Sequence, residues 1–190
     1  PKNSRKFFSN RFIFVVFFLI QFFVVAQANA ACNLAKFSFG SSIQNVEKKI
    51  KAMNAKNLPA TSGFIETEER HSIVFPGEEI CKGDKSFIGA PVEMVFLENK
   101  LVEFRLFKFL EYGDRPELVN WAEGVYGEKN NKPTTFYDLE PNAFWLWGSP
   151  NSTVAYSLIN IGYGIDEVVT IQSNQYPELF KKYSEKEDGL

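Results

Sequence analysis

Apolar and polar residues alternate most regularly between residues 92 and 107, where the pattern predicts a β-hairpin. Two runs with apolar side chains at every second position, 92–97 and 101–107, flank the polar turn Glu98-Asn99-Lys100. The alternate apolar residues are Val92, Met94, Phe96, Val102, Phe104 and Leu106. With Glu93, Glu103 and Arg105 on the opposite side, one sheet face should lie on a core and the other should be partly solvated.

Two other segments carry apolar residues at helical spacing and predict helices over residues 43–53 and 118–125. Ser41 with Gln44 and Asp114 with Glu117 have the spacing of capping boxes, in which a side chain satisfies a free amide of the first turn. Gly127 is placed to end the second helix.

Shorter strands are predicted at residues 64–67, 72–75, 134–139 and 167–173. A second hairpin is predicted from residues 143–147 and 153–159, and a closing helix at 177–183. A helix, strands and a hairpin therefore occur twice in the same order. The layout predicts an α+β fold with an antiparallel sheet, helices packed on one face, and a duplicated α–β unit covering residues 31–110 and 111–190, either as separate units or as one domain.

The segment Phe39-Gly40-x-Ser42-x3-Val46-x3-Ile50, followed by the hairpin of residues 92–107, resembles small exported helix-plus-sheet modules. Two such families are the β-lactamase-inhibitor-protein-like fold and the outer-membrane-assembly lipoproteins of the SmpA type. The resemblance implies a binding protein rather than an enzyme. No functional residue is transferred from either family, because the chain has a single cysteine pair and lacks a lipoprotein cysteine motif.

The first thirty residues are typical of a secretory signal peptide. A basic head precedes an apolar run at residues 12–26, and Ala28-Asn29-Ala30 supplies the small residues that a signal peptidase recognises. As a helix, the apolar run spans about 22 Å, which is short of the ~30 Å hydrocarbon core. We therefore expect cleavage after Ala30, no stable membrane span afterwards, and a periplasmic or secreted protein; retention as an anchor is the alternative.

Cys32 and Cys81 are the two cysteines of the chain. In an oxidising compartment an even pair favours a disulfide. The alternatives are a reactive thiol or a metal ligand, but no CxxC motif is present and His71 is the single histidine. We therefore expect a Cys32–Cys81 disulfide, no metal site and no cofactor.

Removal of residues 1–30 would take four of the 21 Lys and Arg residues and none of the 23 Asp and Glu residues, which leaves a net charge near −6. Nucleic acids and anionic lipids require a basic surface. The charge therefore disfavours nucleic acid as a partner.

The sequence lacks a clear catalytic motif. His71 lacks the companion ligands of a di-iron site, and no serine lies in a Gly-x-Ser-x-Gly elbow. Acidic pairs such as Glu78-Glu79 and Asp166-Glu167 are expected to be solvated. An envelope hydrolase that uses carboxylates or His71 remains the enzymatic alternative.

Aromatic residues of the second hairpin are the best candidates for recognition. Pairing Gly148 with Thr153 places Trp145, Trp147 and Tyr156 on one sheet face, which is either core or a binding platform. The leading hypothesis is a non-enzymatic exported protein that binds another protein of the envelope or extracellular space through this surface. A carrier of a small ligand or glycan is a further alternative; an apolar cavity between helices and sheet would mark it.

Overall fold

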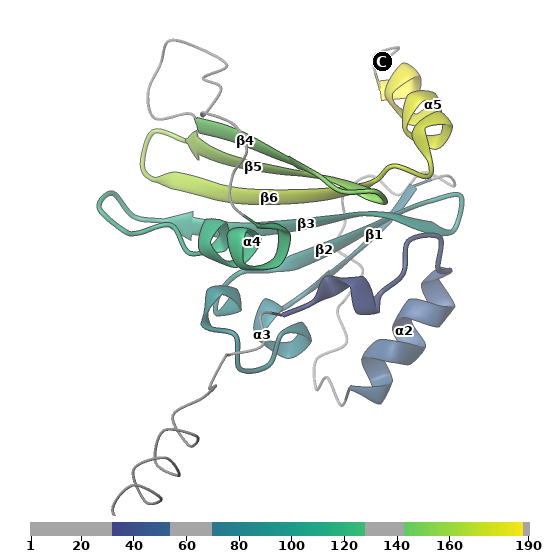
Figure 1. Ribbon diagram of the computed structural model, residues 1–190, viewed down its shortest axis with the longest axis horizontal. Coiled ribbons are helices and arrows are strands. Elements are labelled where there is room, and N and C mark those ends of the chain that lie inside the picture. Colours follow the sequence, from purple (N-terminus) through teal and green to yellow (C-terminus); the bar gives the residue numbers. More distant parts are fainter. Residues whose placement is uncertain (1–31, 54–69, 128–142, 188–190) are drawn as a thin grey trace, which may run out of the picture.

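The computed structural model describes residues 32–53, 70–127 and 143–187, which form one six-stranded antiparallel sheet flanked by helices (Figure 1). The strands are β1 Arg70–Phe75, β2 Val92–Leu97, β3 Lys100–Leu110, β4 Ala143–Gly148, β5 Ser152–Asn160 and β6 Ile165–Ser173. The helices are α2 Ile43–Ala52, α3 Gly77–Ile80, α4 Leu118–Tyr126 and α5 Pro177–Glu187, with the 3-10 turns η1 Leu34–Lys36 and η2 Lys85–Phe87. The predicted α+β class is confirmed.

The strand order β1-β2-β3-β6-β5-β4 joins two similar halves. Each half places three strands after a principal helix, α2 in the first half and α4 in the second. The last strands of the two halves, β3 and β6, pair antiparallel at the centre, with Phe104 opposite Ile171 and Leu106 opposite Val169. The strands of the two halves therefore share one continuous sheet.

The hairpin of β2 and β3 forms as predicted, with one difference in its register. Val95 pairs with Glu103 whereas Phe96 pairs with Leu101, which leaves Val102 as an extra residue in β3. Such a bulge reverses the alternation of side chains between the two faces, so residues before and after it no longer follow one period of two. Consequently Leu101, rather than Val102, shares the main core with Phe104.

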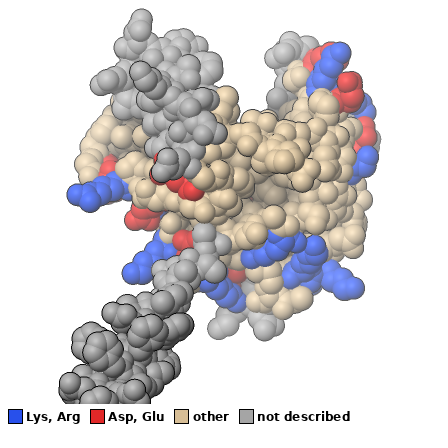
Figure 2. Space-filling view, in the orientation of Figure 1, with Lys and Arg blue, Asp and Glu red and all other residues tan. Residues whose placement is uncertain are grey.

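The beginning of α2 differs from the prediction by one residue. Ser42, rather than Ser41, is the N-cap, and its Oγ accepts a hydrogen bond of 3.4 Å from the Asn45 amide. Val46 and Ile50 are fully buried against the sheet. The opposite side of α2 carries exposed lysines, and Lys and Arg side chains gather over this helix in Figure 2.

Helices lie on both faces of the sheet. The principal core lies under α2 and α4, as expected. On the opposite face, α5 covers a smaller cluster in which Val95, Leu97 and Val102 pack against Leu179 and Phe180. The closing helix is thus longer than predicted and adds a layer that the sequence pattern did not indicate.

Several predictions from the sequence fall outside the described residues. These are the signal segment 1–30 and the strands at 64–67 and 134–139. Within the described part of the chain, no helix has both the length and the hydropathy needed to cross a membrane.

Candidate functional site

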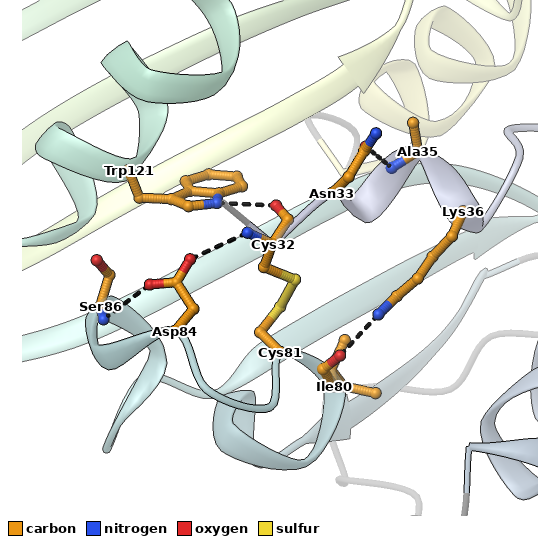
Figure 3. Close-up of a disulfide and its surroundings, with 9 residues drawn as sticks. All are labelled: Cys32, Asn33, Ala35, Lys36, Ile80, Cys81, Asp84, Ser86 and Trp121. Carbon is orange, nitrogen blue, oxygen red and sulfur yellow. Dashed lines mark hydrogen bonds between the residues drawn. A yellow bond between two sulfur atoms is a disulfide. The ribbon is translucent and has the colours of Figure 1, made fainter. Parts of the chain in front are cut away.

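The start of the described chain is fastened to the body of the molecule at three points (Figure 3). Cys32 and Cys81 form the predicted disulfide, with their Cα atoms 5.3 Å apart. The Cys32 amide donates to Asp84 Oδ2 at 3.0 Å, and Trp121 Nε1 donates to the Cys32 carbonyl at 2.9 Å. The disulfide joins residues 49 positions apart, for which chain-entropy arithmetic gives about 4 kcal/mol of stabilisation.

The predicted aromatic platform lies mostly inside the protein. Trp147 is 2% exposed and Tyr156 is 1% exposed, and both belong to the principal core, on the sheet face that α2 and α4 cover. Trp147 Nε1 donates to the Gly127 carbonyl at 3.0 Å, so its polar edge is satisfied internally. The Trp145 side chain lies outside the described part. The register predicted for this hairpin, with Trp147 opposite Val154 and Tyr156 opposite Trp145, is present, but Trp147 and Tyr156 offer no exposed surface.

A buried carboxylate explains why Tyr156 points inward. Glu167 is fully buried, and its Oε1 accepts from Tyr156 Oη at 3.1 Å. The same carboxylate accepts from the amides of Glu117 and Val119, both at 3.0 Å, at the start of α4. Glu167 is therefore not the solvated residue that its acidic neighbourhood suggested.

This arrangement also replaces the predicted capping box of α4. The Asp114 carboxylate accepts from the Glu111 amide at 3.0 Å instead of capping the helix. Glu167, from the central strand β6, takes over the cap and meets the positive end of the helix dipole. Burial raises the pKa of Tyr156 well above its ordinary value, and the charge of Glu167 and the hydrogen bond to it act in the same direction.

Exposed apolar side chains gather at the end of the sheet where β3 finishes and β5 turns into β6. Their exposed fractions range from 43% for Ile159 to 75% for Tyr163. We call this set the exposed apolar cluster; its members are Phe109, Tyr112, Ile159 and Tyr163. It lies at the left end of the sheet in Figure 1, away from α2 and α5.

Contacts among these residues hold the cluster together. The rings of Phe109 and Tyr163 have centroids 6.0 Å apart. Tyr112 Oη donates to Asn160 Oδ1 at 2.9 Å, next to Ile159. In the sheet register, Phe109 and Ile159 flank Asp166 on neighbouring strands, so this acidic residue lies within the apolar row.

The side of the sheet that carries Phe109 also holds an ion-pair group. Glu93 and Glu103 are 5% and 1% exposed, and Arg105 contacts both carboxylates. Gln172 donates a further hydrogen bond to Glu103. Both carboxylates thus have partners within the sheet, and these interactions stabilise the pairing of its strands.

The structure locates His71, on which one form of the enzymatic alternative depends. His71 lies in β1 opposite Phe96, with a half-buried side chain, and not in a charged turn. Within the described ranges, no group of three or more His, Cys, Asp or Glu side chains is arranged to hold a metal ion.

No family model, curated protein or solved structure matches this chain. The resemblance to exported helix-plus-sheet modules therefore stays a prediction, and the functional argument depends on the geometry described above.

The residues of β4 and β5 are apolar on both sides of the strands. The sequence therefore did not indicate which of the two sheet faces a helix covers. The exposed apolar cluster was missed because its members come from separate segments. Phe109 and Tyr112 lie near the end of β3, whereas Ile159 and Tyr163 lie around the turn between β5 and β6.

Proposed function

We propose that the chain is an exported, non-enzymatic binding protein that recognises another protein through the exposed apolar cluster. The observation that carries the proposal is the grouping of Phe109, Tyr112, Ile159 and Tyr163, each 43–75% exposed, at one end of the sheet. Large exposed apolar side chains that group together mark interaction sites. Aromatic residues are enriched among those that dominate binding energy.

The chemistry of the cluster specifies the partner surface. Three aromatic rings and one aliphatic side chain favour an apolar patch on the partner. Asp166 lies between Phe109 and Ile159 in the sheet register and favours a Lys or Arg at the matching position of the partner. An apolar patch centred on one basic residue is the partner surface that fits.

Support for export comes from two independent features. The order of basic, apolar and small segments in residues 1–30 is that of a signal peptide. The Cys32–Cys81 disulfide fits an oxidising compartment, and it begins two residues after the expected cleavage position. Periplasmic or secreted localisation follows from the proposal.

Export is tested by the intact mass of the protein isolated from its native cells without reductant. We expect a chain that begins at Ala31 and is two hydrogens lighter than the reduced form. An uncleaved chain, or one with two free thiols, would contradict export.

Binding is tested by capture from envelope extract with three oxidised baits: the wild type, the double variant Ile159→Ser/Tyr163→Ser, and the control Ile88→Ser. Ile88 is 61% exposed but lies beside η2, outside the cluster. The wild type and the control should retain the same partner. Because residues that dominate an interface each contribute about 2 kcal/mol or more, the double variant should lose at least about tenfold in affinity. Equal capture by all three baits would refute the proposal.

A further inference from the structure

A cavity of about 410 Å³ opens on the sheet face that α2 and α4 cover, opposite the side that carries Phe109. Its walls come from the segment around η1, the end of α4, and the turn between β4 and β5. The volume falls in the range of about 300–1,000 Å³ that is typical of small-molecule sites. Figure 2 views this face, and much of its middle is tan, without charged side chains.

The deep part of the cavity is apolar and contains aromatic rings. Phe104 and Ile171, which are 2% and 3% exposed, project from the central strands. The half-buried Phe39 packs on Phe104 with ring centroids 5.5 Å apart and the ring planes inclined at 51°. Phe39 therefore provides an apolar ring that is supported by the buried Phe104 beneath it.

The rim of the cavity, as far as the described residues form it, is polar and uncharged. Its side chains are carboxamides and hydroxyls, among them Asn33, Ser38, Asn151 and Gln175, all of which are exposed. Among the described residues that line the cavity, none is Asp, Glu, Lys or Arg. Tyr126, another lining residue, contributes a phenol that is neutral at physiological pH.

We propose that this cavity binds a neutral sugar unit, with the apolar face of the ring on Phe39 and its hydroxyls on the rim. A pyranose ring has one face of C–H groups and a periphery of hydroxyls. That combination matches an aromatic floor surrounded by groups that both donate and accept hydrogen bonds. Carboxylates and phosphates do not match, because the described part of the lining holds no cation that would offset their desolvation.

This site is independent of the protein-binding proposal. The cavity and the exposed apolar cluster share no residue, and they lie on different parts of the molecule. Loss of one activity should therefore leave the other intact.

The test is saturation-transfer NMR of the oxidised protein with separate sugars. The neutral probes are glucose, galactose, mannose and N-acetylglucosamine, and the charged probes are glucuronate and glucosamine. We expect saturation of at least one neutral sugar, at least about tenfold weaker binding of the charged probes, and little change with salt. The absence of saturation from all four neutral sugars at millimolar concentration would overturn the proposal, as would equal binding of the charged ones.

Variants then place the binding in the cavity. Asn151→Ala/Gln175→Ala removes two exposed carboxamides from the rim, and Gln44→Ala removes an exposed carboxamide from α2 as the control. The rim variant should bind the sugar at least about tenfold more weakly, whereas the control should bind it as the wild type does. Phe39→Leu should also weaken binding, because it keeps an apolar side chain but removes the flat ring. Unchanged binding in both cavity variants would show that the sugar binds elsewhere and would refute the assignment.

Discussion

The Glu167 side chain connects β6 to the start of α4 and to β5. Its carboxylate is fully buried, caps the first turn of α4, and accepts a hydrogen bond from Tyr156 in the neighbouring strand. A buried carboxylate is tolerated only when hydrogen bonds compensate for the lost solvation. Here three donors do so, and the interaction fixes α4 against the sheet.

Replacement Glu167→Gln should lower the free energy of unfolding by about 1–3 kcal/mol. The new amide group would face one of the three donors and leave it without an acceptor. Urea unfolding measures the change, with the adjacent Asp166→Asn as the control. Equal stability of Glu167→Gln and the control would show that the carboxylate is not needed as a cap.

Tyr126 makes the free energy of unfolding depend on pH in the alkaline range. Burial raises its pKa in the folded state to about 12 from the ordinary 10.0. The unfolded chain then releases this proton more readily above pH 10, so stability is unaffected by Tyr126 below pH 10 and falls as the pH rises towards 12. Tyr126→Phe should show a smaller loss of stability across that interval in pH-dependent unfolding. A wild type and variant with parallel pH profiles would contradict this.

The limits of sequence interpretation are clearest at these residues. Cys32–Cys81 was predictable, because two cysteines allow one pairing. The cap supplied by Glu167 was not, because donor and acceptor are about fifty positions apart in the chain. Local spacing instead favoured Asp114 and Glu117, which form a plausible box in sequence but not in space.

At the scale of elements, periodicity predicted where most strands and helices lie, but not their faces. A single extra residue, Val102, reverses the sheet face on which the first side chains of β3 lie. In β4 and β5 both faces carry apolar residues, so the sequence left open whether Trp147 and Tyr156 were core or surface. The position of α4 decides that they are core.

Close packing between the β5–β6 turn and β3 supports the exposed apolar cluster. A Cβ atom added at Gly164 would lie 2.3 Å from the Phe109 ring and 2.8 Å from the Leu110 carbonyl oxygen. The ring therefore lies directly over the glycine backbone.

Gly164→Ala should destabilise the protein by about 1–3 kcal/mol, because the ring or the backbone must move. Gly148→Ala is the matched control, since an added Cβ there meets no atom within 4 Å. Thermal unfolding of both variants measures the difference. Equal melting temperatures would contradict the packing of Phe109 on Gly164.

For the molecule as a whole, the repeated layout of the sequence indicated the α+β class, and the structure adds how the halves meet. Pairing of β3 with β6 cannot be read from either half alone, because it joins the last strands of both. The disulfide and the Trp121 hydrogen bond then attach the start of the described chain to both halves, since Cys81 precedes β2 and Trp121 lies in α4.

The most direct test of the proposed function is photo-crosslinking in cells that export the protein. A photoreactive phenylalanine analogue replaces Ile159 in one variant and Ile88 in another; both positions are exposed, and only Ile159 belongs to the exposed apolar cluster. Illumination should produce a discrete covalent adduct with one envelope or extracellular protein from position 159 and none from position 88. No adduct from position 159, or the same adducts from both positions, would contradict recognition through the exposed apolar cluster.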